Sequence, residues 1–248
     1  MGKSATRKTR PIVICGAARS GTTALSIMLN RHAEIGIARE IELYKLPSIV
    51  PLLSETAAHH GEGWTAERRD EVVKAIWFFI GRPVNPAKLA ARRWGTKTPW
   101  SEFNRDLWDP LVSPLWIYVL RRGDRVFQSN LKLGYGETEH PARMIGKYKE
   151  SVRLGEAMRG DGSGHLCQLD LASDRKARER LARDLFDFLE EDMDAGVAEF
   201  VEKWPTRHPA TEPTNENGPA GSVELPEEWQ QLLAADTEYQ ELMLAHGY

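Results

Sequence analysis

The sequence predicts an α/β fold, in which a parallel sheet is flanked by helices within a single domain. Short apolar runs alternate along the chain with longer segments of helical spacing, and strands that alternate with helices pair in parallel. A glycine-rich loop also follows the first apolar run and precedes a helical segment, a junction typical of nucleotide-binding sheets. The chain has 248 residues, which is enough for one full hydrophobic core.

Five short segments are the expected strands. They are residues 11–16, 35–38, 93–97, 115–120 and 165–171. The run Leu-Trp-Ile-Tyr-Val-Leu at 115–120 is apolar throughout, as expected of a parallel strand that is covered on both faces. We therefore expect this run to lie inside the sheet.

Helical spacing of apolar residues predicts the helices. One helix follows the 16–21 loop and ends near His32, and the others are expected at 42–60, 65–80, 138–158, 173–203 (as one or two helices) and 226–246. Gly123-Asp124 is expected to begin a further helix with Asp124 as its N-cap. Residues 205–223, rich in Pro, Gly, Asn, Thr and Glu, are expected to form a loop or a lid.

Composition describes an ordinary globular protein. Hydrophobic residues make up 41% and charged residues 28%, and the net charge of −3 does not favour a general nucleic-acid binder. Residues 1–10 contain four basic residues and no acid, so we expect a disordered basic tail before a domain at 11–248. Cys15 and Cys167 each lie in an apolar run, which favours buried free thiols over a disulfide.

Targeting and metal-binding signals are weak. No apolar stretch approaches the ~20 residues of a membrane span, and no apolar region near the N-terminus suits a signal peptide. We therefore expect a cytoplasmic protein without a membrane span. No His/Cys cluster has the spacing of metal ligands, so no metal is expected. The sequence does not indicate the oligomeric state.

The first motif is the Gly-Ala-Ala-Arg-Ser-Gly-Thr-Thr segment at 16–23. Between a strand and a helix, backbone N–H groups of such a loop form a cradle for an anion. The spacing is close to that of the nucleotide-binding P-loop, but Thr22 stands where that motif has its lysine. This substitution argues against an ordinary kinase or NTPase. The alternative is a tight turn in which the glycines serve close packing.

Residues 15–32 resemble the 5'-phosphosulfate loop of sulfotransferases that use 3'-phosphoadenosine-5'-phosphosulfate (PAPS), whose core is Lys/Arg-Ser-Gly-Thr-Thr. The Arg-Ser-Gly-Thr-Thr version is similar to the tyrosylprotein and carbohydrate-type branches. The resemblance implies a P-loop-like fold and a site for the 5'-phosphate and sulfate of the donor. The loop residues that it assigns to this site are Arg19, Ser20, Gly21, Thr22 and Thr23. His32-Ala33 departs from the His-Pro that often ends this helix in the family.

The second motif is Arg121 with Ser129. Arg121 leaves the end of the expected 115–120 strand, and Ser129 lies eight residues later in the next helix. A guanidinium and a hydroxyl together suit a phosphate. The family's 3'-phosphate motif has the same arrangement, so the resemblance assigns these two residues to the 3'-phosphate of PAPS. Without a shared ligand they are an ordinary surface arginine and a helix serine, and Arg122 or Arg125 can share the role.

Glu40 and Lys97 are the candidate catalytic residues, together with Arg19. Glu40 follows the 35–38 strand, where a carboxylate can take a proton from an acceptor hydroxyl. The resemblance to the tyrosylprotein branch assigns the general base to Glu40. Glu42, His59 and His60 remain the alternatives. Lys97 closes the 93–97 strand in a Lys-x-Pro segment, and the resemblance gives it the role of neutralising the leaving oxygen.

The resemblance implies transfer of a sulfuryl group from PAPS to an acceptor hydroxyl, with 3'-phosphoadenosine-5'-phosphate as product. The acceptor is a glycan, a small molecule or a tyrosine. Four tryptophans can stack on it or belong to the core: Trp64, Trp77, Trp94 and Trp100. The alternatives are a kinase or NTPase with a degenerate P-loop and a non-catalytic nucleotide-binding module.

One departure concerns the 3'-phosphate. The cytosolic branch closes over this group with a basic segment near its C-terminus, whereas this chain has no Lys or Arg after Arg207. Lys203, Arg207 or a backbone N–H of 208–222 replaces that segment, or the 3'-phosphate is held more weakly.

Overall fold

The computed structural model describes residues 7–39, 88, 91–134, 140–204 and 224–248. Within these residues five strands form one parallel sheet in the order β2-β3-β1-β4-β5, which confirms the predicted fold class. The strands are β1 (Ile12–Cys15), β2 (Ile35–Arg39), β3 (Arg93–Lys97), β4 (Leu115–Leu120) and β5 (Gly164–Gln168). The helices are α1 (Thr22–Arg31), α4 (Arg105–Val112), α5 (Gly123–Leu131), α6 (Pro141–Gly160), α7 (Arg175–Leu189), α8 (Ala195–Glu202), α9 (Glu227–Ala235) and α10 (Thr237–Ala245).

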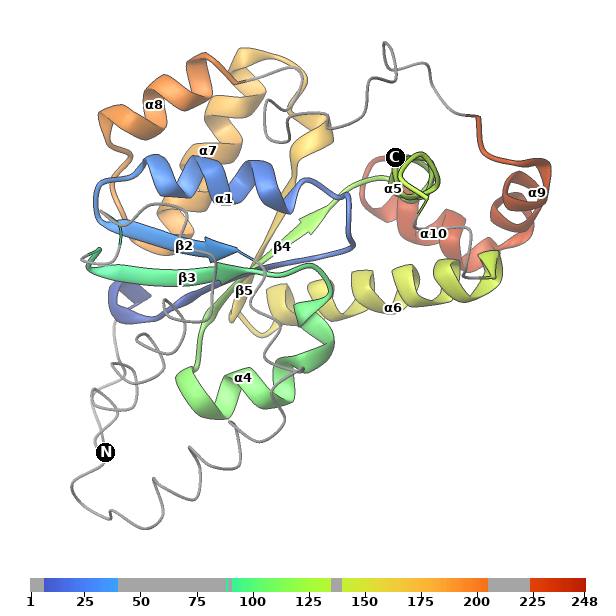
Figure 1. The fold of residues 1–248 in the computed structure, drawn as a ribbon, viewed down its shortest axis with the longest axis horizontal. Coiled ribbons are helices and arrows are strands. Elements are labelled where there is room, and N and C mark those ends of the chain that lie inside the picture. Colours follow the sequence, from blue (N-terminus) through green and yellow to red (C-terminus); the bar gives the residue numbers. More distant parts are fainter. Residues whose placement is uncertain (1–6, 40–87, 89–90, 135–139, 205–223) are drawn as a thin grey trace.

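The sheet lies between two layers of helices. Figure 1 shows α1, α7 and α8 over one face and α4 and α6 over the other. The strand arrows point toward α5, α9 and α10, which lie beyond the C-terminal ends of the strands. In open α/β sheets this end carries the ligand site.

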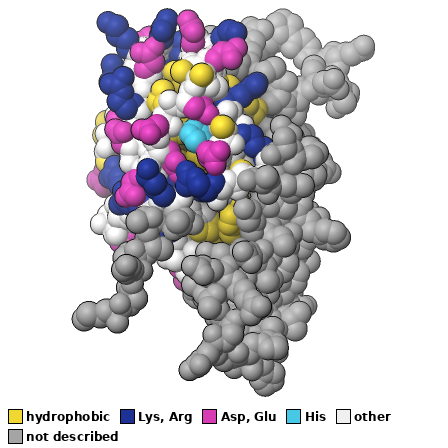
Figure 2. All heavy atoms as spheres, turned by 90° about the vertical axis from the view of Figure 1, so that its left-hand side faces the viewer, with side chains coloured by type: hydrophobic (Ala, Val, Ile, Leu, Met, Phe, Trp, Pro, Cys, Tyr) yellow, Lys and Arg dark blue, Asp and Glu magenta, His cyan; other side chains and the backbone are white. Residues whose placement is uncertain are grey.

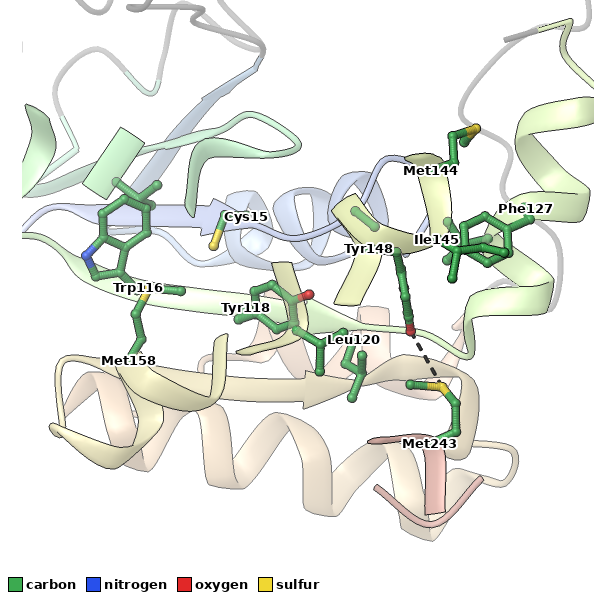
Figure 3. Close-up of a cluster of buried hydrophobic side chains, with 14 of the residues drawn as sticks. Cys15, Trp116, Tyr118, Leu120, Phe127, Met144, Ile145, Tyr148, Met158 and Met243 are labelled. Atoms are coloured by element: carbon green, nitrogen blue, oxygen red, sulfur yellow. Dashed lines mark hydrogen bonds between the residues drawn. The ribbon is translucent and has the colours of Figure 1, made fainter. Parts of the chain in front are cut away.

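Two hydrophobic cores follow from the alternation of side chains along each strand. Val13 and Cys15 face one core and Ile12 and Ile14 face the other, so all four residues of β1 are fully buried. Figure 3 shows part of the first core, with Cys15, Trp116 and Tyr118 among its side chains. A central strand without polar residues is what burial on both faces requires.

The opposite end of the sheet is held by charged groups. Arg93, only 1% exposed, donates to Arg10 O at 3.0 Å and Leu189 O at 2.7 Å, and pairs with Glu191 at 3.2 Å. On the side of the molecule that lies at the left in Figure 1, Figure 2 shows acidic and basic side chains interspersed. The described part of this face therefore has no single sign of charge that would attract a polyanion.

The disordered basic tail was expected to extend to residue 10, and this extent is partly wrong. Arg7–Thr9 form a short 3-10 helix, and Arg10 donates to Ser113 O and Pro114 O, both at 2.7 Å. Residues 7–10 are thus attached to the domain by hydrogen bonds to backbone carbonyls.

The end of β5 and the start of α5 differ from expectation. The strand expected at 165–171 ends at Gln168, opposite Leu120, because β4 offers no further partner, and Leu169–Leu171 form a 3-10 helix. The expected N-cap at Asp124 is wrong, since the helix begins at Gly123 and Arg122 is its N-cap. The carboxylate of Asp124 instead accepts from Arg125 N at 2.8 Å, which remains favourable near a helix N-terminus.

The helix expected at 226–246 is two helices. α9 ends at Ala235, and Asp236 begins α10 by accepting a hydrogen bond from Tyr239 N at 2.9 Å. The 173–203 segment likewise forms α7 and α8, as one of the two expected arrangements. The helices expected at 42–60 and 65–80 and the loop or lid at 205–223 lie outside the described residues. No described helix has the length and apolarity needed to cross a membrane.

Candidate functional site

The 16–21 loop joins β1 to α1 at the C-terminal edge of the sheet. Three of its residues have positive φ: Gly16 at 120°, Arg19 at 75° and Gly21 at 107°. A Cβ on Gly16 would lie 2.4 Å from Val119 O, so only glycine lets the loop pass this close to β4. The sequence therefore folds here into the sharp strand-to-helix turn that an anion cradle needs.

The start of α1 has polar groups available for an anion. Gly21 is the N-cap and contributes no side-chain hydrogen bond, so the first backbone N–H groups of the helix lack a side-chain acceptor. Ser20 is 2% exposed, and its Oγ has no hydrogen-bond partner among the described residues. An orphaned buried hydroxyl beside an uncapped helix start fits a phosphate or sulfate group.

The structure brings the two sequence motifs together. Arg19 Nε donates to Ser129 Oγ at 3.0 Å, and Arg121 NH1 donates to Arg19 O at 3.0 Å. Arg19 is more than 100 positions from Arg121 and Ser129 in the chain, yet its two contacts join the motifs where β1 and β4 end. A single ligand can therefore contact both motifs.

Like charges gather at this surface. Burial lowers the pKa of Arg121, and the neighbouring charges of Arg19 and Arg125 lower it further, whereas Asp170 opposes them. An anion bound beside Arg121 would stabilise its charged form. The electrostatics of the site thus favour an anionic ligand.

A second set of contacts fixes the Arg121 turn. Asp170 accepts from Tyr248 Oη at 2.5 Å and from Arg122 N at 3.2 Å, and Tyr148 Oη donates to Arg121 O at 2.6 Å. Sequence reasoning missed Asp170 and Tyr148. Neither residue lies in one of the sequence motifs, so no signal in the sequence pointed to them.

Lys97 ends β3 at the same edge of the sheet. It pairs in register with Ile14 of β1 on one side and with Arg39 of β2 on the other, and it is only 1% exposed. A lysine with this burial differs from the usual solvated surface lysine. Its backbone position, one strand from the 16–21 loop, is compatible with the predicted role.

Other predicted residues lie elsewhere or outside the described part. Glu40, Glu42, His59, His60, Trp64, Trp77 and Arg207 are outside the described residues. Trp94 is a core residue at 5% exposure, whereas Trp100 is partly exposed and has Lys147 Nζ 4.5 Å above its ring. Lys203 pairs with Glu199 at 2.7 Å on the surface of α8. Among the described residues no cluster of His, Cys, Asp or Glu is arranged to hold a metal.

Comparison with known proteins rests on structure. No protein-family model and no curated protein matches the sequence. Among solved structures, the sulfotransferase domain from the Synechococcus PCC 7002 olefin synthase superimposes with a TM-score of 0.54 and 16% identity over 100% of this chain and 98% of that one. The chain has a sulfotransferase fold.

A second solved structure is the sulfotransferase STF9 from Mycobacterium avium. It matches with a TM-score of 0.47 and 13% identity, over 82% of this chain and 69% of that one. In the sulfotransferase fold of the present chain, the 16–21 loop and the Arg121 turn occupy the C-terminal edge of the sheet.

Proposed function

We propose that this protein is a PAPS-dependent sulfotransferase that transfers a sulfuryl group to an acceptor hydroxyl. Two hydrogen bonds carry this proposal, one between Arg19 and Ser129 and one between Arg121 and Arg19. They bring together the two segments that resemble the 5'-phosphosulfate and 3'-phosphate motifs. PAPS has anionic groups at both ends of its ribose, so it can use both motifs at once. A triphosphate has no group for the second motif.

The donor-binding residues have distinct roles in this proposal. Backbone N–H groups of the 16–21 loop, with the hydroxyls of Ser20, Thr22 and Thr23, hold the 5'-phosphosulfate. Arg121 and Ser129 hold the 3'-phosphate. The donor supplies an activated sulfuryl group, whose bond to the phosphate oxygen breaks as the acceptor oxygen attacks sulfur.

The remaining roles concern protons and developing charge. Glu40 takes the proton of the acceptor hydroxyl as the new S–O bond forms. Lys97 and Arg19 stabilise the negative charge that the departing phosphate oxygen gains. The acceptor is a glycan, a small alcohol or phenol, or a tyrosine, and an assay has to choose among them.

Donor binding is tested by calorimetry. We expect adenosine 3',5'-bisphosphate, the product form of the donor, to bind more tightly than ATP and to do so without magnesium. ATP binding that requires magnesium, with no binding of the bisphosphate, would instead establish the kinase or NTPase alternative.

Transfer is tested with labelled PAPS against glycans, phenols, small alcohols and tyrosine peptides. We expect label to appear in one of these classes. A protein that binds the bisphosphate but transfers label to none of them and does not hydrolyse PAPS is the non-catalytic nucleotide-binding module.

A further inference from the structure

A fully buried carboxyl group lies directly behind the 16–21 loop. Glu102 belongs to the short 3-10 helix Ser101–Asn104 (η5) and is 1% exposed. Its Oε2 accepts a hydrogen bond from Gly16 N at 3.0 Å. A buried carboxyl group is rare unless its oxygens are satisfied, so its contact with the first residue of the loop needs an explanation.

The segment that contains Glu102 holds Gly16 from both sides. Trp100 N donates to Gly16 O at 3.0 Å, and Thr98 N donates to Ile14 O at 3.1 Å. Both polar backbone groups of Gly16 are therefore bonded to residues just beyond β3. Glycine at a φ of 120° has more conformational freedom than any other residue, so these two bonds decide the direction in which the loop leaves β1.

Glu102 is itself held by side chains from three elements. Ser151 of α6 bonds to its Oε1, the Cys15 thiol of β1 bonds to the carboxyl group, and Tyr118 Oη of β4 lies 2.8 Å from Ser151 Oγ. Ser151, Cys15 and Tyr118 are all no more than 1% exposed. This network gives Glu102 a fixed rotamer and connects it to both strands next to the site.

Hydrogen bonding, rather than negative charge, suits this position. Burial raises the pKa of Glu102, and its hydrogen bonds only partly offset that effect. The titratable groups that face it, Cys15 and Tyr118, also have pKa values raised by burial. Oε2 accepts from Gly16 N and Oε1 accepts from Ser151 Oγ. A carboxyl group can accept a hydrogen bond whether or not it is ionised, so its contact with the loop does not require negative charge.

We propose that Glu102 is a positioning residue for the phosphate loop, which fixes the Gly16 N–H and thereby orients the cradle for the donor's 5'-phosphosulfate. The proposal rests on the proposed function for the identity of that anion. Glu102 contacts neither donor nor acceptor. It acts through its hydrogen bond to Gly16 N. Lys97 directly precedes residues 98–102, the segment that bonds to Ile14 and Gly16. Glu102 therefore also fixes the position of the loop relative to β3.

The test compares variants that differ in one bond each. Glu102→Gln keeps an acceptor for Gly16 N–H, and its amide nitrogen faces Ser151 Oγ, which then accepts instead of donating. We therefore expect its affinity for adenosine 3',5'-bisphosphate to stay within about threefold of wild type. Glu102→Met keeps the length of the side chain and removes the acceptor. We expect it to weaken binding by about tenfold or more, because small displacements of positioning groups have large effects.

Ser151→Ala is the matched control. It removes a buried bond from the same network but leaves the Glu102–Gly16 contact, so we expect a lower Tm and an affinity within about threefold of wild type. Glu102→Asp, one methylene shorter, is the second variant if Glu102→Met does not fold, and it should also weaken binding. Unchanged affinity in the folded Met or Asp variant would make Glu102 a stability residue only, and a loss in Gln equal to that in Met would show that charge is needed.

Amide hydrogen exchange separates this proposal from the proposed function. If wild type does not bind the bisphosphate, the proposed function fails, but loop positioning is still measured by exchange at residues 16–21. We expect faster exchange there in Glu102→Met and wild-type exchange in Ser151→Ala. Equal exchange in Glu102→Met and wild type would overturn the positioning role.

Discussion

Arg121 has two roles at the candidate site. It supports the 16–21 loop, and its positive charge is proposed to bind the 3'-phosphate. Its Nη1 donates to Arg19 O, and its half-buried guanidinium interacts electrostatically with Asp170. A phosphate that binds here must compete with Asp170 for the positive charge. A substitution of Arg121 can therefore remove a ligand contact, the support of the loop, or both, and its test has to distinguish the two effects.

The first prediction concerns Arg121→Ala. A charge-assisted phosphate contact contributes roughly 1.5–3 kcal/mol, so affinity for adenosine 3',5'-bisphosphate should fall about 10- to 100-fold. Affinity for AMP, which lacks the 3'-phosphate, should fall much less. Calorimetry at fixed ionic strength measures both. Arg125→Ala, on the exposed side of the same turn, tests whether that arginine shares the role. Equal weakening of the two ligands by Arg121→Ala would move the 3'-phosphate site elsewhere.

The second prediction concerns the base. Glu40→Gln keeps the shape of the side chain and removes its basicity, so turnover should fall by about 10²–10⁴-fold while donor affinity stays within about threefold. Steady-state kinetics and calorimetry give the two quantities separately. If Glu40→Gln remains active and His59→Ala or His60→Ala does not, the base is a histidine.

At the scale of elements, the phosphate loop depends on how closely it approaches β4. The Cβ of a residue replacing Gly16 would overlap Val119 O, a backbone atom that cannot rotate away. Gly162 has a φ of +75° and open space around its Cβ position. A comparison of substitutions at Gly16 and Gly162 therefore separates the effect of steric overlap from the effect of backbone strain.

The third prediction follows from this pair. Gly162→Ala should lower the free energy of unfolding by about 1–2 kcal/mol, the usual effect of a left-handed conformation on a residue with a Cβ. Gly16→Ala should lower it by more than about 3 kcal/mol, because overlap with backbone adds to strain. Urea denaturation measures both. Equal losses would mean that the loop relaxes away from β4 without cost.

Local pattern predicted most strands and missed features that depend on distant partners. The segments at 93–97 and 115–120 coincide with β3 and β4, and the second is apolar throughout, as a parallel strand covered on both faces should be. The end of β5 was predicted too late, because the apolar alternation continues to Leu171 while the partner strand stops at Leu120. A sequence pattern cannot show where a neighbouring strand ends.

The candidate site shows the same limit. Arg19, Arg121 and Ser129 were predicted from motif spacing, and the structure brings them together. Helix α4 and the 3-10 helix with Glu102 were not predicted, because Pro110 lies inside the segment Ser101–Val112 and a proline usually marks the end of a helix. The role of Glu102 appears only once Gly16 and Ser151 are known to be its neighbours. The role of Glu40 stays a prediction, as do the other site assignments.

At the scale of the whole molecule, the reactivity of the two thiols measures whether the sheet is intact. Cys15 and Cys167 are the two cysteines of the chain, and both are free and buried. Burial raises the pKa of Cys15 well above its usual range and that of Cys167 to about 12. Neither thiol is ionised near neutral pH in the folded protein, and the thiolate is the reactive form.

The fourth prediction is therefore that a disulfide reagent labels no thiol in the native protein at pH 7.5 and labels both after denaturation. Labelling under native conditions should proceed at the rate of opening and should slow when adenosine 3',5'-bisphosphate is bound. Ser173→Cys, at an exposed position, is the positive control and should react at once. Rapid labelling of the unmodified native protein would contradict the buried, neutral state of the two thiols.

The position of β1 in the middle of the sheet also affects how the chain folds while it is being synthesised. β1 precedes both of its partners, residues 95–97 and 115–118, so it can be paired on both sides only after β4 has emerged. At about 5–20 residues per second, synthesis of residues 1–120 takes about 6–24 s. Throughout that interval at least one edge of the apolar β1 segment is unpaired, and an unpaired apolar edge is prone to aggregation.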